Sequence, residues 1–400
     1  MILGLLRETK NPVDNRVALT PEQAAMMKCQ YPGIDVWVQS SQNRAFTDAE
    51  YQQMGLIVTD NMSPCDLLLG IKEANVDSLI PGKHYVFFGH FAKGQRYNQP
   101  LLQSLMDKQI TFSDYEYMVD EEGCRVCAFG WWAGIVGVYY TLRGYGIRTG
   151  LYSLPQPDTN FTVSQIKSLL LAVELPKVKM VLTGRGRVAR GAQYILNEIG
   201  ANVVPVDDYL KNNAVDRFTC TFAYIDQLVR HKEGDGPVDV TEFHAHPDRF
   251  TSDFMRFART SDILVCCHYW NPGDPVYLSS EDYRDPSFRI RMIGDITCDI
   301  QGSVWSTLRA STHADPFYDY NPETEMEEPA FSSDKNISVM AVDTCPNALP
   351  RETSFYFGDM LLEHVLRPLS EGRNSAVLER ATILKEGKLT QRFHYLEEIF

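Results

Sequence analysis

The sequence has 400 residues, 44% of them hydrophobic and 22% charged, and a formal net charge of −14. A chain of this length and composition is expected to form two globular domains, and a disordered protein is excluded. The acidic balance argues against nucleic acid and anionic membranes as partners.

The chain carries no pattern typical of a membrane or exported protein. No apolar run reaches the roughly 18 residues that a membrane span needs. The apolar start, residues 1–6, ends at Arg7 without a cleavage site, so a strand is predicted there rather than a signal peptide. Most of the nine cysteines are scattered singly, which is typical of reduced thiols. We therefore expect a cytoplasmic protein, and the sequence is compatible with an oligomer.

Strand and helix patterns alternate through the first third of the chain. Residues 2–6 are predicted to form a strand, and Thr20 followed by Pro21 marks the start of a helix. Strands separated by helices predict a parallel sheet. The further predicted elements are strands at 35–39, 66–71 and 85–88, a helix at 101–107 and a strand from Thr111.

A glycine-rich apolar segment, Gly130 to about Tyr145, predicts a long helix that leaves the first domain and packs closely on a neighbour. The second domain opens with a strand at 177–183. Acidic residues 321–329 predict a surface loop. The later predicted elements are strands at 201–206, 262–268, 291–296 and 337–342 and a helix that runs through Leu366.

A glycine-rich turn follows the strand 177–183 and precedes a predicted helix at 192–199. It fits the dinucleotide fingerprint G-x-G-x-x-G/A, in which Gly184 permits the tight turn, Gly186 lets the backbone approach a pyrophosphate and Ala189 allows close packing. The helix N-terminus then offers free N–H groups to phosphate. The predicted nucleotide-binding residues of this turn are Gly184, Arg185, Gly186, Arg187 and Val188.

The cofactor is predicted to be NAD or NADP, with a slight preference for NAD. Asp207 ends the next predicted strand about 20 residues on, where a carboxylate accepts from a ribose 2′-hydroxyl. Arg185, Arg187 and Arg190 crowd the turn, and one of them would suit a 2′-phosphate.

Two ionisable residues, Lys72 and His90, follow predicted strands of the first domain. If these strands are parallel neighbours, both side chains emerge at the sheet edge where ligands bind in α/β proteins. A desolvated lysine can act as a base, and histidine titrates near neutrality. From spacing alone, a solvated lysine and a surface histidine are the other interpretation.

Metal binding is not expected. His244 and His246 are two residues apart without a visible third ligand, and Cys124 and Cys127 lack a second pair. The histidines are predicted to lie on a surface loop and the cysteines to be small core residues.

Several segments resemble a known family. Residues 6–10, 15–21 and 71–73 resemble the alanine dehydrogenase/transhydrogenase superfamily. Other segments resemble the lysine-forming saccharopine dehydrogenases and the lysine–ketoglutarate reductase domain of the bifunctional lysine-degrading enzyme. These segments are 90–95, 125–134, 183–193, 246–250, 342–352 and 357–361.

The resemblance implies a reversible reaction in which saccharopine, NAD(P)+ and water give lysine, 2-oxoglutarate and NAD(P)H. It implies that Lys72 and His90 move protons and that Glu73 and Glu116 tune the lysine. It further implies that three cations and a glutamine bind the carboxylates of the substrate, that Asp343 lies near substrate and nicotinamide, and that the loop reaching Asp299 passes the nicotinamide. The carboxylate-binding residues would be Arg16, Lys93, Gln95 and Arg125.

The predicted fold class is α/β, with two Rossmann-like domains, parallel sheets and an interdomain cleft. Residues 1–134 and 345–400 are predicted to form the substrate domain, and 135–344 the NAD(P)-binding domain. Small amino acids and 2-oxo acids are the expected partners. Two other functions stay open: another amino-acid dehydrogenase, such as alanine dehydrogenase, and a non-catalytic protein that senses NAD(H).

Overall fold

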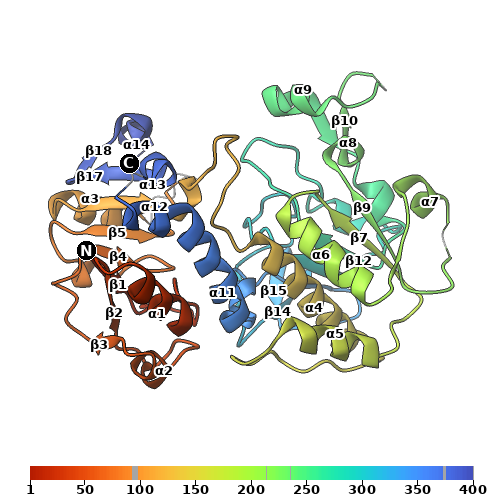
Figure 1. Ribbon diagram of the computed structural model, residues 1–400. Coiled ribbons are helices and arrows are strands. Elements are labelled where there is room, and N and C mark those ends of the chain that lie inside the picture. The colour runs from red at the N-terminus through yellow and green to blue at the C-terminus, as the bar shows by residue number, and fades with distance from the viewer. Residues whose placement is uncertain (92–97, 213, 235, 373–374, 400) are drawn as a thin grey trace. The chain divides into compact units, whose positions relative to one another are not determined.

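The computed structural model describes residues 1–91, 98–212, 214–234, 236–372 and 375–399. The chain forms two compact units (Figure 1). Unit 1 comprises Met1–Phe129 and Leu349–Phe400, and unit 2 comprises Gly130–Ala348. Within the described residues, no helix is both long and apolar enough to cross a membrane.

Unit 1 is built on an eight-stranded sheet in the order β18-β17-β6-β5-β4-β1-β2-β3. The six strands from β6 to β3 pair in parallel, and β17 and β18 add an antiparallel edge. The strands are β1 (Ile2–Leu5), β2 (Asp35–Gln39), β3 (Ile57–Thr59), β4 (Leu67–Leu69), β5 (His84–Phe87), β6 (Thr111–Asp114), β17 (Thr382–Lys385) and β18 (Lys388–Leu389).

The helices of unit 1 begin where the sequence offers caps. The Thr20 hydroxyl accepts from the backbone N–H of Gln23, and the side chain of Gln23 accepts from the backbone N–H of Thr20. This capping box starts α1 as predicted. The principal helices are α1 (Pro21–Gln30), α2 (Asp48–Gln53), α3 (Gln99–Asp107), α11 (Pro350–Leu361), α12 (Arg367–Ser370), α13 (Ala376–Ala381) and α14 (Leu396–Ile399).

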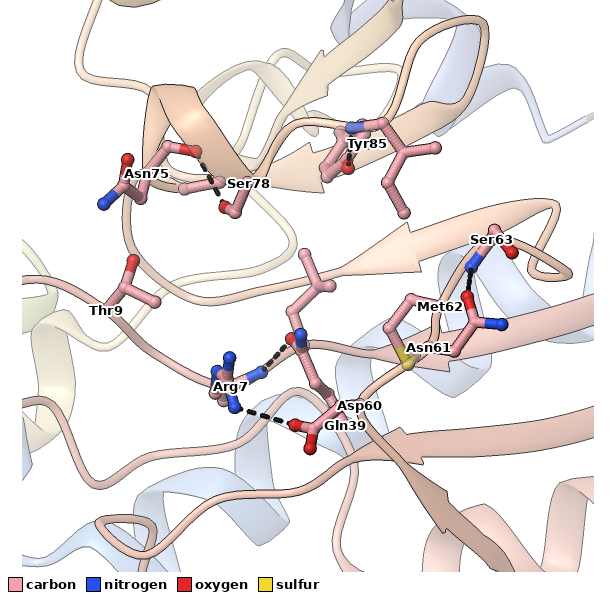
Figure 2. A pocket seen from close by; sticks show the side chains of 13 residues that line it. Arg7, Thr9, Gln39, Asp60, Asn61, Met62, Ser63, Asn75, Ser78 and Tyr85 are labelled. Carbon is pink, nitrogen blue, oxygen red and sulfur yellow. Dashed lines mark hydrogen bonds and ion pairs between the residues drawn. The ribbon is translucent and has the colours of Figure 1, made fainter.

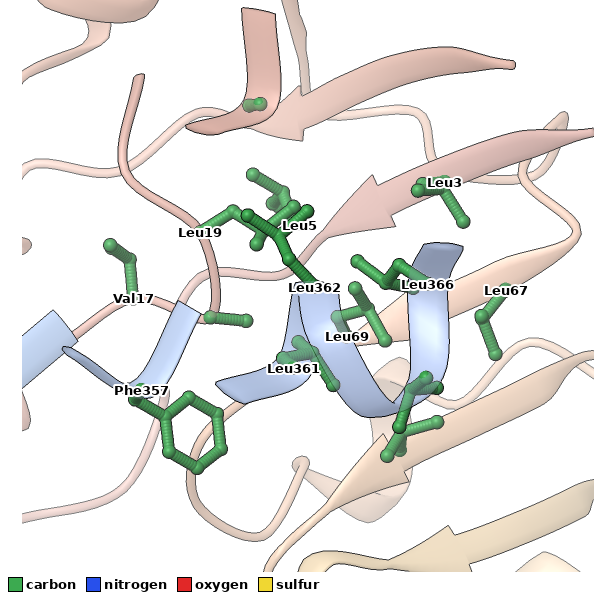
Figure 3. Packing of buried hydrophobic residues seen from close by; sticks show 14 of the residues in the cluster. Leu3, Leu5, Val17, Leu19, Leu67, Leu69, Phe357, Leu361, Leu362 and Leu366 are labelled. Carbon is green, nitrogen blue, oxygen red and sulfur yellow. The ribbon is translucent and has the colours of Figure 1, made fainter. Parts of the chain in front are cut away.

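The C-terminal segment of the chain helps to form the core of unit 1. Helix α11 continues into a π-helical turn, Leu362–Leu366, and both pack on the sheet. In Figure 3, Leu361 and Leu366 lie among leucines of β1 and β4, such as Leu5 and Leu69. Burial of these side chains fixes one face of β1 and β4, so the carboxyl ends of the two strands have a rigid support.

Unit 2 holds a second eight-stranded sheet, in the order β15-β14-β16-β13-β12-β7-β9-β8. It is parallel except for β14 and β15. The strands are β7 (Lys179–Thr183), β8 (Asn202–Val203), β9 (Thr219–Ala223), β12 (Ile263–Cys266), β13 (Met292–Asp295), β14 (Phe317–Asn321), β15 (Met326–Glu328) and β16 (Ile337–Met340). Two largely parallel sheets confirm the predicted α/β class.

Helices α4 (Gly130–Thr149) and α6 (Arg187–Glu198) run side by side in unit 2 (Figure 1). A methyl group at Gly191 would overlap the carbonyl oxygen of Trp131, and one at Gly134 would overlap that of Val188. The two glycines therefore let the helix backbones touch, as the glycine-rich sequence predicts. The other helices of the unit include α5 (Val163–Ala172), α7 (Val206–Lys211), α8 (Ile225–Leu228), α9 (Val240–Ala245) and α10 (Met255–Ala258).

Two predicted elements of unit 2 differ from the structure. The strand expected at 201–206 is only Asn202–Val203, because Pro205 caps α7 and acidic residues in its first turn favour the helix. The loop expected at 321–329 contains β15, which pairs antiparallel with β14. There Asn321 donates to Glu328 across the hairpin at 2.6 Å, so polar side chains stabilise an exposed edge strand.

Candidate functional site

Lys72 and His90 lie just beyond the carboxyl ends of two neighbouring strands. β4 and β5 are parallel, with Leu69 opposite Val86. Both strands end within four residues of that pair, which confirms the expectation that they end at one edge of the sheet. His90 has a φ of +54°, an unusual backbone conformation for a residue other than glycine. The polypeptide turns sharply at this histidine, beside the strand that leads to Lys72.

Glu73 connects the residues around Lys72. Its two carboxylate oxygens accept from Lys10 Nζ at 2.9 and 2.7 Å, and Oε1 lies 3.7 Å from His90 Nδ1. Burial alone would raise the pKa of Glu73, but His90 and Lys10 outweigh it and hold the pKa below its usual range. Glu73 is therefore an anion that faces both the histidine and a lysine.

His90 is a neutral base near pH 7. Burial lowers its pKa, the nearby Lys72 adds to that effect, and Glu73 opposes it. Its Nδ1 has no hydrogen-bond partner among the described residues. A neutral imidazole in this position is suited to take a proton from a bound substrate.

Glu8 holds the segment that carries Lys72. Its Oε1 accepts from the backbone N–H of Ile71 at 2.7 Å, and its Oε2 accepts from that of Lys72 at 2.8 Å. Burial and the nearby Asp14 raise the pKa of Glu8 to about 8, although the two N–H groups act in the opposite direction. A carboxyl on the segment after β1 thus fixes the backbone after β4.

Glu8 should make stability depend on pH. Between its ordinary pKa of 4.5 and about 8 the folded chain retains a proton that the unfolded chain has lost. The contribution of Glu8 to the free energy of unfolding therefore falls as pH rises through this window and is constant above it. The difference in free energy of unfolding, Glu8→Gln minus wild type, should increase over the same range.

Urea unfolding of both proteins at about pH 5.5, 7 and 8.5 measures this difference. The exposed Glu121→Gln serves as a control for the loss of one carboxylate. A difference for Glu8→Gln that stays constant with pH would contradict the assignment.

Arg16 belongs to a buried ion pair. Its Nε and Nη2 donate to the two carboxylate oxygens of Asp14 at 2.9 and 2.5 Å, and its guanidinium carbon lies 4.2 Å from the centre of the Phe129 ring. Burial would raise the pKa of Asp14, but Arg16, with help from Lys72, lowers it. A substrate carboxylate would have to bind guanidinium N–H groups of Arg16 other than those that donate to Asp14.

Glu116 and Arg125 meet at the neighbouring strand end. Glu116 follows β6, and its Oε1 lies 3.7 Å from Arg125 Nη2. Asp114 fixes this turn, because its carboxylate accepts from the backbone N–H of Glu116 at 2.8 Å and from that of Gly89 at 3.1 Å. The turns that carry Glu116 and His90 are thus tied to one carboxyl group.

Four further predicted site residues remain, two for the substrate carboxylates and two near the nicotinamide. Lys93 and Gln95 fall outside the described residues. Asp343 is exposed after β16, and Asp299 is partly buried after β13, both in unit 2.

The glycine-rich turn of unit 2 has the shape that a nucleotide phosphate requires. Gly184 has a φ of +89°, and a side chain there would meet Cys267 O at 2.8 Å. Gly186 is the N-cap of α6 and has no side-chain cap, and the space where a side chain would begin is open to 4 Å. The N-terminus of α6 thus lacks a side-chain cap, as is typical of helix N-termini that bind anions. Arg185 and Arg187 are exposed, and Val188 is partly buried.

A partly buried histidine, His268, borders the same turn. Thr183 Oγ1 accepts from the backbone N–H of Cys267 at 3.2 Å and lies 2.6 Å from His268 Nδ1, to which its hydroxyl can donate. Burial lowers the pKa of His268 to about 3, so the ring is neutral. Its Nε2 has no hydrogen-bond partner among the described residues. An orphaned polar atom and a glycine cradle together fit a polar ligand at this turn.

Asp207 lies on α7, and its side chain is exposed. The preceding strand, β8, pairs with β9 and not with β7. Asp207 thus does not end a strand beside the glycine-rich turn, in contrast to the expectation from spacing.

A separate pocket of about 460 Å³ lies in unit 1 (Figure 2). Arg7 crosses it and donates to Asp60 at 2.9 Å, and the backbone of Arg7 donates to Gln39 at 3.2 Å. The predicted catalytic residues are absent from its lining, which also includes Thr9, Asn61, Ser63, Asn75, Ser78 and Tyr85.

His244, His246, Cys124 and Cys127, which were considered as metal ligands and judged not to be, do not form one cluster. His244 and His246 are both exposed, as predicted, but His244 lies on the short helix α9 and His246 is its C-cap residue, where a loop was expected. Cys127 is buried as predicted, but Cys124 is exposed because it sits in a turn that Asp120 caps. Across the described ranges, no group of three or more potential ligands is positioned for a metal ion.

The sequence did not reveal the supporting residues Glu8, Lys10 and Asp14. Glu8 and Lys10 lie in the segment 6–10, which resembles the superfamily, and Asp14 lies just before the second such segment, 15–21. The partners of Glu8 and Lys10, which are Ile71, Lys72 and Glu73, lie more than 60 residues away, so only the sheet order brings these groups together.

Comparisons with known proteins agree with this arrangement. Residues 4–136 match the family model described as alanine dehydrogenase/PNT, N-terminal domain. The fold resembles a solved structure of L-alanine dehydrogenase with a TM-score of 0.68 at 17% identity, over 100% of this chain and 99% of the other. The fold is thus that of the alanine dehydrogenase/transhydrogenase class.

Sequence relatives indicate which members of this class the chain is most similar to. The chain is 30% identical to an alpha-aminoadipic semialdehyde synthase of Arabidopsis thaliana, over 99% of this chain and 41% of the relative. It is 27% identical to the Neurospora crassa protein named saccharopine dehydrogenase [NAD(+), L-lysine-forming], over 97% and 96%. The chain spans less than half the length of the Arabidopsis relative. The chain is thus similar, over nearly its whole length, to L-lysine-forming saccharopine dehydrogenases, and its first third matches the N-terminal domain of the alanine dehydrogenase/transhydrogenase superfamily.

Proposed function

We propose that the protein is an NAD(P)-dependent oxidoreductase that converts saccharopine and water reversibly to L-lysine and 2-oxoglutarate. One observation carries the proposal. Lys72, Glu73 and His90 gather at the ends of two neighbouring parallel strands, with Glu73 between His90 and Lys10. Relatives named for this activity, matched over nearly their whole length, support it.

The chemistry requires proton transfers that this cluster can perform. When saccharopine is oxidised, the secondary amine must lose a proton, and a C–H bond of the carbon beside the nitrogen must yield a hydride. Water must then add to the resulting imine. The C–N bond then breaks, and the lysine nitrogen takes up a proton. We assign these transfers to Lys72 and His90, since His90 is neutral near pH 7 and can accept a proton. Glu73 and Glu116 stabilise the cationic forms that arise during turnover.

Cationic and polar side chains would hold the carboxylates of the substrate. We assign this role to Arg16, Lys93, Gln95 and Arg125, and we place Asp343 near the reacting carbon. Arg125 is exposed, and its Nη2 lies 3.7 Å from Glu116 Oε1. A substrate carboxylate could form a shorter hydrogen bond with the same guanidinium.

The dinucleotide would be held at the turn from Gly184 to Val188, where the N-terminus of α6 offers N–H groups to its phosphates. When bound, the nicotinamide supplies the hydride acceptor or donor. Asp299 is assigned to the loop that borders it. NAD is preferred to NADP, in keeping with the name of the Neurospora crassa relative.

The remaining expectations belong to the same proposal. The partners are small molecules and not nucleic acid, in line with a net charge of −14. All nine cysteines are free, which suits a cytoplasmic location. An oligomer is compatible with the chain.

A spectrophotometric assay tests the proposal. NADH and then NADPH would be supplied with 2-oxoglutarate and either L-lysine or L-alanine, and separately with pyruvate and ammonia. We expect oxidation of the nucleotide only with L-lysine and 2-oxoglutarate. Oxidation with pyruvate and ammonia would instead identify an alanine dehydrogenase. Nucleotide binding without turnover in any mixture would favour a sensor of NAD(H).

A further inference from the structure

The strand order of unit 2 departs from the simplest dinucleotide-binding sheet. In that sheet the second strand of the chain lies beside the first, and its end reads the adenosine ribose. Here the second strand, β8, occupies the outer edge, and the third strand, β9, lies between it and β7. The position beside the glycine-rich turn therefore belongs to β9.

The end of β9 lies directly against that turn. Ala223 is opposite Thr183 in the parallel ladder, and the N–H of Gly184 donates to Ala223 O at 2.9 Å. The chain then leaves the sheet through Tyr224 and enters α8, whose first turn carries Asp226. Both Tyr224 and Asp226 are exposed. A carboxylate and an aromatic ring thus follow the strand that neighbours the turn.

Asp207 is poorly placed for the same task. Adjacent strands are about 4.8 Å apart, so β8 runs roughly 10 Å from β7. β8 also ends early: Val203 is opposite Cys220, three residues before the end of β9. Hydrogen bonds to a ribose require heavy atoms within about 3.2 Å. The chain reaches Asp207 only after Pro205 has turned it into α7.

We infer that Asp226, with Tyr224 beside it, reads the adenosine ribose in this protein, and that Asp207 does not. The inference rests on the proposed dinucleotide site and adds the residue that selects the cofactor. A carboxylate accepts from ribose hydroxyls and repels a 2′-phosphate. The segment 223–229 carries no lysine or arginine to offset that repulsion. The protein therefore prefers NAD(H) to NADP(H).

The test is nucleotide affinity in the absence of substrates, measured by quenching of protein fluorescence with NADH and with NADPH. Wild type should bind NADH more tightly. Asp226→Asn should weaken NADH binding about tenfold, the loss expected for a hydrogen bond to a charged group. Asp226→Arg should strengthen NADPH binding, a gain that misfolding cannot produce. Asp207→Asn is the matched control and should change either affinity less than twofold.

Two results would overturn the inference. One is a loss of NADH affinity in Asp207→Asn with none in Asp226→Asn; the other is unchanged affinities in both Asp226 variants. Either result would leave the proposed function intact, because nucleotide still binds. Failure of wild type to bind NADH or NADPH would instead remove the proposed function together with the inference.

Discussion

Replacement of Lys72 by methionine should lower kcat by about 10²–10⁴-fold, the usual contribution of a general acid–base group. Methionine retains most of the aliphatic length and removes the amine that we assign to proton transfer. The backbone N–H of residue 72 would still donate to Glu8, so the local fold should persist. Steady-state kinetics with NADH, 2-oxoglutarate and L-lysine measure the loss.

The control for this variant is Lys388→Met, which removes an exposed lysine of unit 1 on β18. It should keep the kcat of wild type. NADH affinity should be unchanged in both variants, since the glycine-rich turn belongs to unit 2. A Lys72→Met enzyme with a kcat within threefold of wild type would contradict the assignment of Lys72.

Substitution of Gly191 by alanine should lower the free energy of unfolding by about 1–3 kcal/mol or more, the range for overpacking a rigid contact. The added methyl would overlap the backbone carbonyl oxygen of Trp131. That oxygen belongs to α4, so the helix itself must shift. Because α6 starts at the glycine-rich turn, nucleotide affinity should fall as well. Urea unfolding and NADH titration would follow the two effects.

Gly33→Ala is the matched control, because a methyl group there would meet no atom within 4 Å. Its free energy of unfolding should stay within about 0.5 kcal/mol of wild type, as for ordinary surface changes. Equal stability of Gly191→Ala and Gly33→Ala would show that α4 and α6 are not in close contact.

The sequence predicted features that depend on local pattern. Lys72 and His90 were placed at one sheet edge because apolar runs mark the strands and parallel strands end together. The turn at Gly184 was predicted by its glycine spacing. The glycines of the segment 130–145 predicted that α4 packs closely on a neighbour, but they did not identify that neighbour as α6.

Features that depend on strand order could not be predicted from the sequence. The bond from the backbone of Lys72 to Glu8 joins residues 64 apart, and no periodicity encodes it. Asp207 has the right spacing from Gly184, but spacing does not reveal that β9 inserts between β7 and β8. The edge strand β15 could not be predicted because its acidic residues have low intrinsic strand propensity.

The central claim, reductive condensation of lysine with a 2-oxo acid, is tested most directly by isotope transfer. NADH with deuterium at both C4 positions would be incubated with the protein, L-lysine and 2-oxoglutarate, and the products analysed by mass spectrometry. We expect a product that joins the two carbon skeletons through one nitrogen and carries one deuterium. Deuterium found only in a product that lacks the lysine skeleton, or in no product at all, would contradict the claim.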